Sequence, residues 1–183
     1  MGRIEALTPF WYHRARLTSP RPSPFDIGLR ANVRPLRDDD RAPIEALLRA
    51  SHNFSERDVA VALEVIGDAL AGDPEYIVNV IENGAITGYE CHGPTPLTEG
   101  TFDLYWIVVD PRAQKRGYGR LLLRAAEEDV KKRGGRMLLI DTSSQVNYTP
   151  TINFYKRNGY HLEARIHDFY HSGDDKLVFA KKL

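Results

Sequence analysis

The stretch VVDPRAQKRGYGRLLL, residues 108–123, joins the end of an apolar strand to a basic loop and then to the start of an amphipathic helix. The first turn of a helix leaves backbone N–H groups without partners and carries the positive end of the peptide dipoles. Gly117 and Gly119 keep side chains away from those donors. Positive charge is added by Lys115, Arg116 and Arg120. We therefore predict that this loop binds a pyrophosphate.

The 183 residues suffice for a single domain with a substantial core. Because 25 basic and 25 acidic residues cancel, no global field favours nucleic acid or an anionic membrane as a partner. The single cysteine, Cys91, has no partner for an internal disulfide, which favours a reducing compartment. No apolar run approaches the roughly 20 residues that cross a bilayer. We expect a soluble, cytoplasmic protein.

Residues 1–28 differ in composition from the rest of the chain. Four prolines lie among arginines, serines and aromatic residues without apolar periodicity, which argues against a helix or a central strand. We predict a flexible, proline-rich N-terminal extension. The alternative is an arm whose aromatic side chains dock on the domain or on a second subunit. Residues 29–183 are expected to form the folded domain.

From residue 31 onward, apolar spacing predicts strands and helices in alternation. Asp38 and Ser55 are expected to begin two helices, and residues 82–84 are expected to form a hairpin turn. Strands are predicted at 32–36, 76–81, 85–92, 101–109, 136–141, 160–166 and 177–181, with further helices at 117–132 and 150–157. This order predicts an α/β or α+β domain built on a mixed sheet.

Two motifs carry a family resemblance. The loop QKRGYG, residues 114–119, matches the pattern Q/R-x-x-G-x-G/A directly after a strand, and FYKRNGY, residues 154–160, is similar to FY-x-x-x-GY/F. Residues 32–183 thereby resemble the GNAT superfamily of acyl-CoA-dependent N-acyltransferases. The resemblance implies a mostly antiparallel central sheet of about seven strands flanked by about four helices. It also implies acetyl-CoA as the cofactor, and it allows a homodimer.

The resemblance places coenzyme A along two segments. The pyrophosphate is expected at Gln114, Lys115, Arg116, Gly117, Tyr118, Gly119 and Arg120. The pantetheine arm is expected along the main chain of Ile107, Val108 and Val109, which also polarises the thioester carbonyl. Many members carry Asn seven residues before the tyrosine of the second motif, where this chain has Tyr148. We expect Asn147 or Asn153 to take over that contact.

Transfer of an acyl group from a thioester to an amine needs a neutral amine, a polarised carbonyl and a proton for the departing thiolate. The resemblance makes Tyr155 the candidate general acid, and the alternative is a core tyrosine packed beside Phe154. Asp103 is the first candidate base, because a carboxylate on an apolar strand is costly to bury unless it is paired or functional. Glu90, on one face with His92, is a rival. A water relay, or a structural pair of Asp103 with an arginine, is also open.

The acceptor is expected on the face of the strand that holds Asp103 and Tyr105, which alternation places together with Ile107 and Val109. The resemblance also brings the segment 167–176 near the acceptor. Its acids and aromatics suit a cationic amine, and the alternative is a polar hairpin loop. The candidate acceptor-binding residues are Tyr105, Thr142, Ser143, Asp168, Tyr170 and Asp175, although Thr142 and Ser143 equally fit a turn.

The expected activity is transfer of an acetyl group from acetyl-CoA to a primary amine of a small molecule by direct attack. The neutral composition gives no sign of docking to a strongly charged macromolecule. The alternatives are acetylation of a protein N-terminus or lysine, and noncatalytic sensing of acyl-CoA. The six histidines show no metal-ligand spacing, so we expect no metal site.

Overall fold

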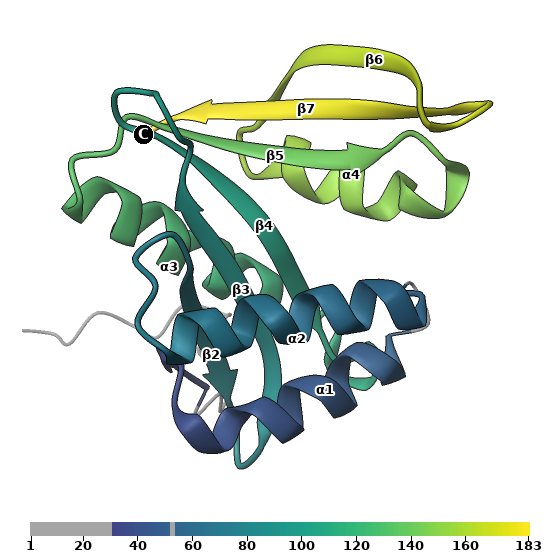
Figure 1. Cartoon of the computed structure of the whole chain (residues 1–183). Coiled ribbons are helices and arrows are strands. Elements are labelled where there is room, and N and C mark those ends of the chain that lie inside the picture. The colour runs from purple at the N-terminus through teal and green to yellow at the C-terminus, as the bar shows by residue number, and fades with distance from the viewer. Residues whose placement is uncertain (1–30, 52–53) are drawn as a thin grey trace, which may run out of the picture.

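The computed structural model describes residues 31–51 and 54–183. One sheet runs through these residues in the order β1-β2-β3-β4-β5-β7-β6 (Figure 1). Its strands are β1 (Asn32–Pro35), β2 (Ile77–Glu82), β3 (Ile86–Pro94), β4 (Thr101–Val109), β5 (Met137–Ser143), β6 (His161–His171) and β7 (Asp174–Lys182). Among these strands only β4 and β5 pair in parallel. The predicted mixed, mostly antiparallel sheet is confirmed, whereas the predicted extension, residues 1–28, lies outside the described residues.

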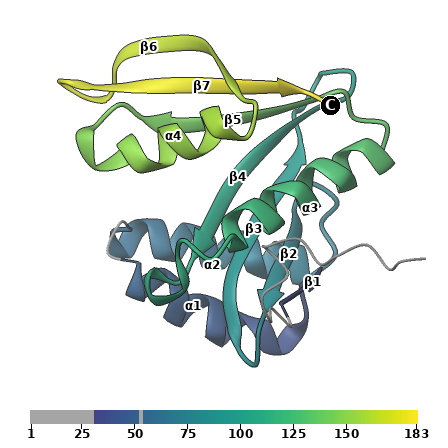
Figure 2. The same ribbon diagram turned by 180° about the vertical axis from the view of Figure 1, so that it is seen from behind.

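Helices cover both faces of the sheet. Figures 1 and 2 show α1 and α2 on one face of β2–β4 and α3 on the opposite face, with α4 beside β5. Their bounds are α1 (Arg41–Ala50), α2 (Glu56–Leu70), α3 (Tyr118–Lys132) and α4 (Thr149–Arg157), and short 3₁₀ turns are η1 (Asp38–Asp40), η2 (Pro111–Ala113) and η3 (Val146–Tyr148). Within the described ranges, no helix is both long enough and apolar enough to cross a membrane.

The predicted helix starts agree with the structure to within one turn. Ser55 caps α2, since its hydroxyl accepts from the N–H of Asp58 at 3.2 Å and its own N–H donates to the Asp58 carboxylate at 2.8 Å. The first helix instead begins with a 3₁₀ turn, at the end of which the buried Asp40 carboxylate binds the Arg34 guanidinium at 2.6 and 2.8 Å. That pair ties the start of α1 to β1.

A split opens between β4 and β5. Their pairing runs from Thr101 opposite Met137 to Leu104 opposite Ile140 and then stops. Beyond this point β4 stays paired with β3, and β5 stays paired with β7. The register between β3 and β4 shifts here, which makes Tyr105 an unpaired bulge residue. The outer part of β4 therefore diverges from β5, as Figure 1 shows.

The bulge overturns one prediction about the faces of β4. Leu104 and Ile107 both pack on the cluster that includes α3, whereas Trp106 packs on the cluster formed with α1 and α2. Asp103, the neighbour of Leu104, therefore faces away from Ile107. The prediction that Asp103 and Tyr105 share a face with Ile107 and Val109 was wrong, because strict alternation ends at a bulge.

The last two strands are longer than predicted. The segment 167–176, considered as a possible long loop, instead continues β6 and β7 and is joined by a tight turn at Gly173, whose φ is 82°. Side-chain hydrogen bonds extend this hairpin. The Asp168 carboxylate accepts from the N–H of Gly173 at 2.7 Å, and the Asp175 carboxylate accepts from the N–H of Asp168 at 2.9 Å.

Candidate active site

The loop before α3 presents a row of free backbone donors. It turns through two left-handed residues, Lys115 with φ 62° and Gly117 with φ 87°. Among the described residues, the N–H groups of 115–120 meet no acceptor. A Cβ built on Gly117 would meet no atom within 4 Å, so the space in front of these donors is open. Open space, free N–H groups and a helix start fit a phosphate group.

The side chains around this loop have different roles. Lys115, Arg116 and Arg120 are exposed. Tyr118 is buried instead, and its hydroxyl accepts from the Asn83 side-chain amide at 2.9 Å. Tyr118 therefore anchors α3 to the β2–β3 turn, and only its N–H belongs to the row of donors. Gln114 lies with its amide nitrogen 3.5 Å from the carbonyl oxygen of Val109, which connects the loop to the end of β4.

Tyr155 lies at the closed end of the split. It belongs to the same packed cluster as Leu104 and Ile140, the last paired residues of β4 and β5. Its ring lies 5.5 Å from that of Phe154 and 6.2 Å from that of Phe179, between centroids, and the residue is 4% exposed. Burial raises the pKa of the Tyr155 phenol, so the hydroxyl is protonated at neutral pH and can act as a proton donor.

Glu90 is part of a buried ionic network under α3. One carboxylate oxygen accepts from the Asn79 amide at 2.6 Å, and the other lies 2.9 Å from Nδ1 of His92. The second ring nitrogen of His92 lies 3.1 Å from the carboxylate of Asp129, which also binds Arg133 at 2.5 Å. Burial raises the pKa of Glu90. Glu90 and His92 share a face, as predicted, but both oxygens of Glu90 are engaged within the protein.

Asp103 forms no pair with an arginine among the described residues. Its carboxylate accepts from the Thr95 hydroxyl at 2.7 Å and is only partly buried. It faces the side of the sheet that carries α1 and α2, opposite to Tyr155. Asp103 and Tyr155 therefore lie on opposite faces of the sheet.

Tyrosine side chains lie on elements that border the split between β4 and β5. Tyr105 is 39% exposed and its ring lies 5.8 Å from that of Tyr76, and burial raises the pKa of Tyr105 to about 12. Across the split, burial raises the pKa of Tyr148, and the carboxylates of Asp58 in α2 and Asp174 in β7 raise it further. The sequence had marked Tyr148 only as a departure from the family pattern.

Tyr170 belongs to the same region. Burial is the largest cause that raises the pKa of Tyr170, and the carboxylates of Asp141 and Asp174 and the nearby Tyr148 raise it further. Ser143, at the end of β5, donates to Asp174 at 2.5 Å. Thr142 is buried. Ser143 is therefore engaged within the protein by Asp174, and the roles of Ser143, Thr142 and Tyr170 toward an acceptor stay predictions.

Asp168 and Asp175, the predicted acceptor-binding acids of the last hairpin, both form hydrogen bonds within the protein. The N–H of Asp168 donates to Asp175 and holds the pKa of that carboxyl below its usual range, and the Arg165 guanidinium lowers it further. Asp168 itself closes the turn at Gly173. Both side chains shape the hairpin. Asn147 and Asn153 are exposed, on η3 and α4, and are open to a ligand.

No group of three His, Cys, Asp or Glu side chains within residues 31–51 and 54–183 is arranged to hold a metal ion. The donors that the site offers are backbone N–H groups, a protonated phenol and cationic side chains. Such groups bind anions and stabilise negative charge.

Comparisons with known proteins agree with this geometry. A profile described as the acetyltransferase (GNAT) family matches residues 41–160. A protein of Desulfovibrio desulfuricans assigned to the GNAT family is 36% identical, with a TM-score of 0.80 over 83% of this chain and 98% of that one. No curated protein matches the chain.

Two more distant solved structures share the fold. The ribosomal-protein-S18-alanine N-acetyltransferase of Escherichia coli is 18% identical, with a TM-score of 0.68 over 83% of this chain and 93% of that one. YncA of Salmonella typhimurium, solved with its cofactor acetyl-CoA, is 21% identical, with a TM-score of 0.66 over 84% and 94%. Fold, motifs and family match lead to one assignment: the chain belongs to the GNAT family of acetyltransferases, which use acetyl-CoA.

Proposed function

We propose that the protein transfers the acetyl group of acetyl-CoA to a primary amine of a small molecule, in the cytoplasm. The observation that carries the proposal is the row of free N–H groups at residues 115–120, which lies beside the end of the split β4 strand. The position of Tyr155 at the closed end of the same split supports a reaction there. The single cysteine, Cys91, has no partner for an internal disulfide, and this supports the proposed compartment.

When bound, acetyl-CoA supplies an activated thioester. The free donors of 115–120 would hold its diphosphate, and the outer part of β4, Ile107–Val109, would pair with the pantetheine arm along the edge that β5 leaves free. Asn147 or Asn153 would add a side-chain contact to that arm. These contacts fix the reacting carbonyl beside the acceptor, and positioning of this kind removes much of the entropic barrier.

Proton transfer would use groups on both faces of β4. Tyr155 would donate to the departing sulfur, since its raised pKa keeps the phenol protonated. For the amine proton we propose Asp103, acting directly or through water, in preference to Glu90. Both oxygens of Glu90 are engaged by Asn79 and His92, and the residue is fully buried. Asp103→Asn should therefore lower kcat more than Glu90→Gln does at equal protein stability.

The acceptor pocket is proposed to be narrow and lined by tyrosines. Tyr105 lies on the β4 side, and Tyr148 and Tyr170 lie on the β5–β7 side. A pocket closed in this way favours a small amine over a folded protein. A homodimer, if formed, would use the exposed edge strand β6.

The test is release of free thiol from acetyl-CoA in the presence of small primary amines and of peptides with free N-termini or lysines. We expect thiol release with small amines and little with peptides. Preference for peptides would contradict the small-molecule acceptor, and coenzyme binding without thiol release from any amine would indicate a sensor.

A further inference from the structure

Strand β6 is an edge of the sheet that is exposed along its whole length. It lies at one end of the strand order and, among the described residues, pairs with β7 alone. All eleven of its residues are exposed. Figures 1 and 2 show β6 at the border of the sheet, beyond β7. Within the described part of the chain, its outer row of backbone N–H and C=O groups therefore faces no other strand.

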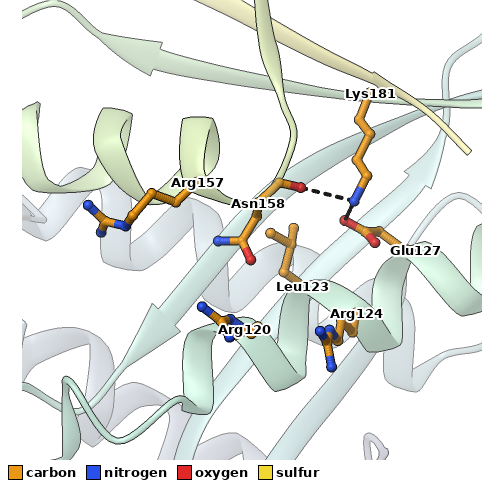
Figure 3. A pocket seen from close by; sticks show the side chains of 7 residues that line it. All are labelled: Arg120, Leu123, Arg124, Glu127, Arg157, Asn158 and Lys181. Carbon is orange, nitrogen blue, oxygen red and sulfur yellow. Dashed lines mark hydrogen bonds and ion pairs between the residues drawn. The ribbon is translucent and has the colours of Figure 1, made fainter.

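The side chains that join the sheet to its helices extend only as far as β7. Lys181 reaches from β7 to the Glu127 carboxylate on α3 at 2.8 Å and to the carbonyl oxygen of Asn158 at 3.0 Å (Figure 3). The residues that line the pocket drawn there come from α3, β7 and the end of α4, and none of them belongs to β6. β6 therefore lies outside this layer of contacts.

Large apolar side chains are exposed on both faces of β6. Leu162 lies opposite Phe179, a core residue, whereas Ile166 lies opposite Lys176. Phe179 and Lys176 are three residues apart on β7, so their side chains point to different faces of the sheet. Leu162, Ile166, Phe169 and Tyr170 are each between 47% and 51% exposed. A missing helix would expose one face only, so the missing neighbour lies along the edge.

The opposite edge of the sheet is protected, whereas β6 is not. β1 has four residues and ends at Pro35, and short length and proline both blunt an edge. β6 has eleven residues and contains neither proline nor lysine. The register shift at Glu163 bends β6, yet Leu162 and Ile166 on either side of it stay half exposed. Such an edge is stable in solution when another strand covers it.

We propose that β6 pairs with β6 of a second copy of this chain, in antiparallel orientation about a two-fold axis at Ala164. The sequence around Ala164 is self-complementary in this register. Glu163 of one copy lies beside Arg165 of the other, and Leu162 lies beside Ile166, in each case twice. A two-fold interface requires the same patch to complement itself in this way. An extended segment of another protein would need no such pattern in β6.

Glu163 and Arg165 are both available for these contacts. Arg165 binds the Asp175 carboxylate within its own copy, yet its side chain is 53% exposed, and a guanidinium carries five N–H donors. Glu163 is exposed and has no salt-bridge partner in the described part of the chain. The pairing does not involve the loop of residues 115–120, so it holds or fails independently of the proposed function.

Light scattering or sedimentation of the full chain over a range of concentrations tests the proposal. The wild type should have about twice the 20.8 kDa mass of one chain. Leu162→Lys and Ile166→Lys should each raise the Kd of the dimer by about 10-fold, because the change acts at two symmetric places. Val61→Lys is the matched control, since Val61 is 44% exposed but lies on α2, and it should stay dimeric.

Charge reversal tests the register. Glu163→Arg alone should weaken the dimer because it brings like charges together across the axis, and Arg165→Glu alone should do the same. An equal mixture of the two variants should associate again, since each copy then opposes unlike charges in the other. This recovery also shows that neither variant has merely lost its fold.

A wild type that stays a single chain up to its solubility limit would overturn the proposal, and so would dimers that persist in both lysine variants. A mixture that associates no better than its two components would refute pairing about Ala164. Binding of an extended peptide along β6 by a wild type that stays a single chain would assign the edge to another protein instead.

Discussion

The ring of Tyr155 packs among aromatic neighbours, whereas burial is the cause that raises the pKa of its hydroxyl. Tyr155→Phe keeps the ring and removes the proton, so we expect the free energy of unfolding to change by less than about 0.5 kcal/mol. Loss of a general acid should lower kcat by about 10²- to 10⁴-fold and leave the Kd for coenzyme A unchanged. Steady-state kinetics, calorimetry and urea unfolding measure the three quantities.

Tyr155→Ala provides the packing control at the same residue. Removal of a buried aromatic ring should cost about 3–5 kcal/mol of unfolding free energy. An unchanged kcat in Tyr155→Phe would remove the hydroxyl from the mechanism and leave Tyr155 as a core residue only.

At the scale of elements, the network of Glu90, His92 and Asp129 fastens α3 to β3. Both ring nitrogens of His92 face carboxylates, and an imidazole donates from both only when it is protonated. Burial alone would lower the pKa of His92, but the hydrogen bonds to Glu90 and Asp129 outweigh it and raise the pKa. The contribution of protonated His92 to the free energy of unfolding is therefore fully present below about pH 6.5, the pKa of histidine in the unfolded chain. It is lost as the pH rises through the raised pKa of His92 in the folded protein.

We therefore expect the free energy of unfolding of the wild type to fall as the pH rises above about 6.5, by about 1–3 kcal/mol. The raised pKa of Glu90 acts in the same direction from a lower pH. His92→Gln should lose the part of the fall that the imidazole causes and show a different curve above about pH 6.5, because only the raised pKa of Glu90 then contributes, whereas His161→Gln, an exposed change, should match the wild type. Urea unfolding between pH 5.5 and 9 measures the curves, and parallel curves for wild type and His92→Gln would refute the role of the network.

The elements that local sequence specifies were predicted well. The cap of α2 at Ser55 and the loop of residues 114–119 follow from short-range patterns. The bulge at Tyr105 was not predictable, because it depends on the register between β3 and β4. The length of the last hairpin was missed for a similar reason, since it includes a hydrogen bond from the N–H of Asp168 to the Asp175 carboxylate across the two strands.

At the scale of the whole molecule, coenzyme binding should stabilise the fold, because the ligand groups come from α3, α4 and β4 only when these elements are assembled. A ligand at 100 times its Kd that binds the folded state alone adds about 2.7 kcal/mol to the free energy of unfolding. We expect acetyl-CoA to raise the melting temperature progressively with its concentration. A melting temperature that does not respond to millimolar acetyl-CoA would contradict a site formed by the folded chain.

The charge of the whole chain gives no help in binding an anion, since basic and acidic residues balance. Affinity for coenzyme A must therefore come from local groups, and we expect the free N–H groups of residues 115–120 to hold its diphosphate. Gly117 and Gly72 form a matched pair for testing this, with φ of 87° and 88° and no atom within 4 Å of a Cβ built on either. A valine should strain the backbone similarly at both, by about 1–3 kcal/mol, but only at Gly117 would it cover the donors.

The decisive measurement is the heat of acetyl-CoA binding to the wild type, Gly72→Val and Gly117→Val. Wild type and Gly72→Val should bind with similar Kd, and Gly117→Val should lose most of its affinity although it stays folded. If Gly117→Val binds acetyl-CoA as tightly as Gly72→Val, the backbone of residues 115–120 does not hold the diphosphate, and the central claim fails.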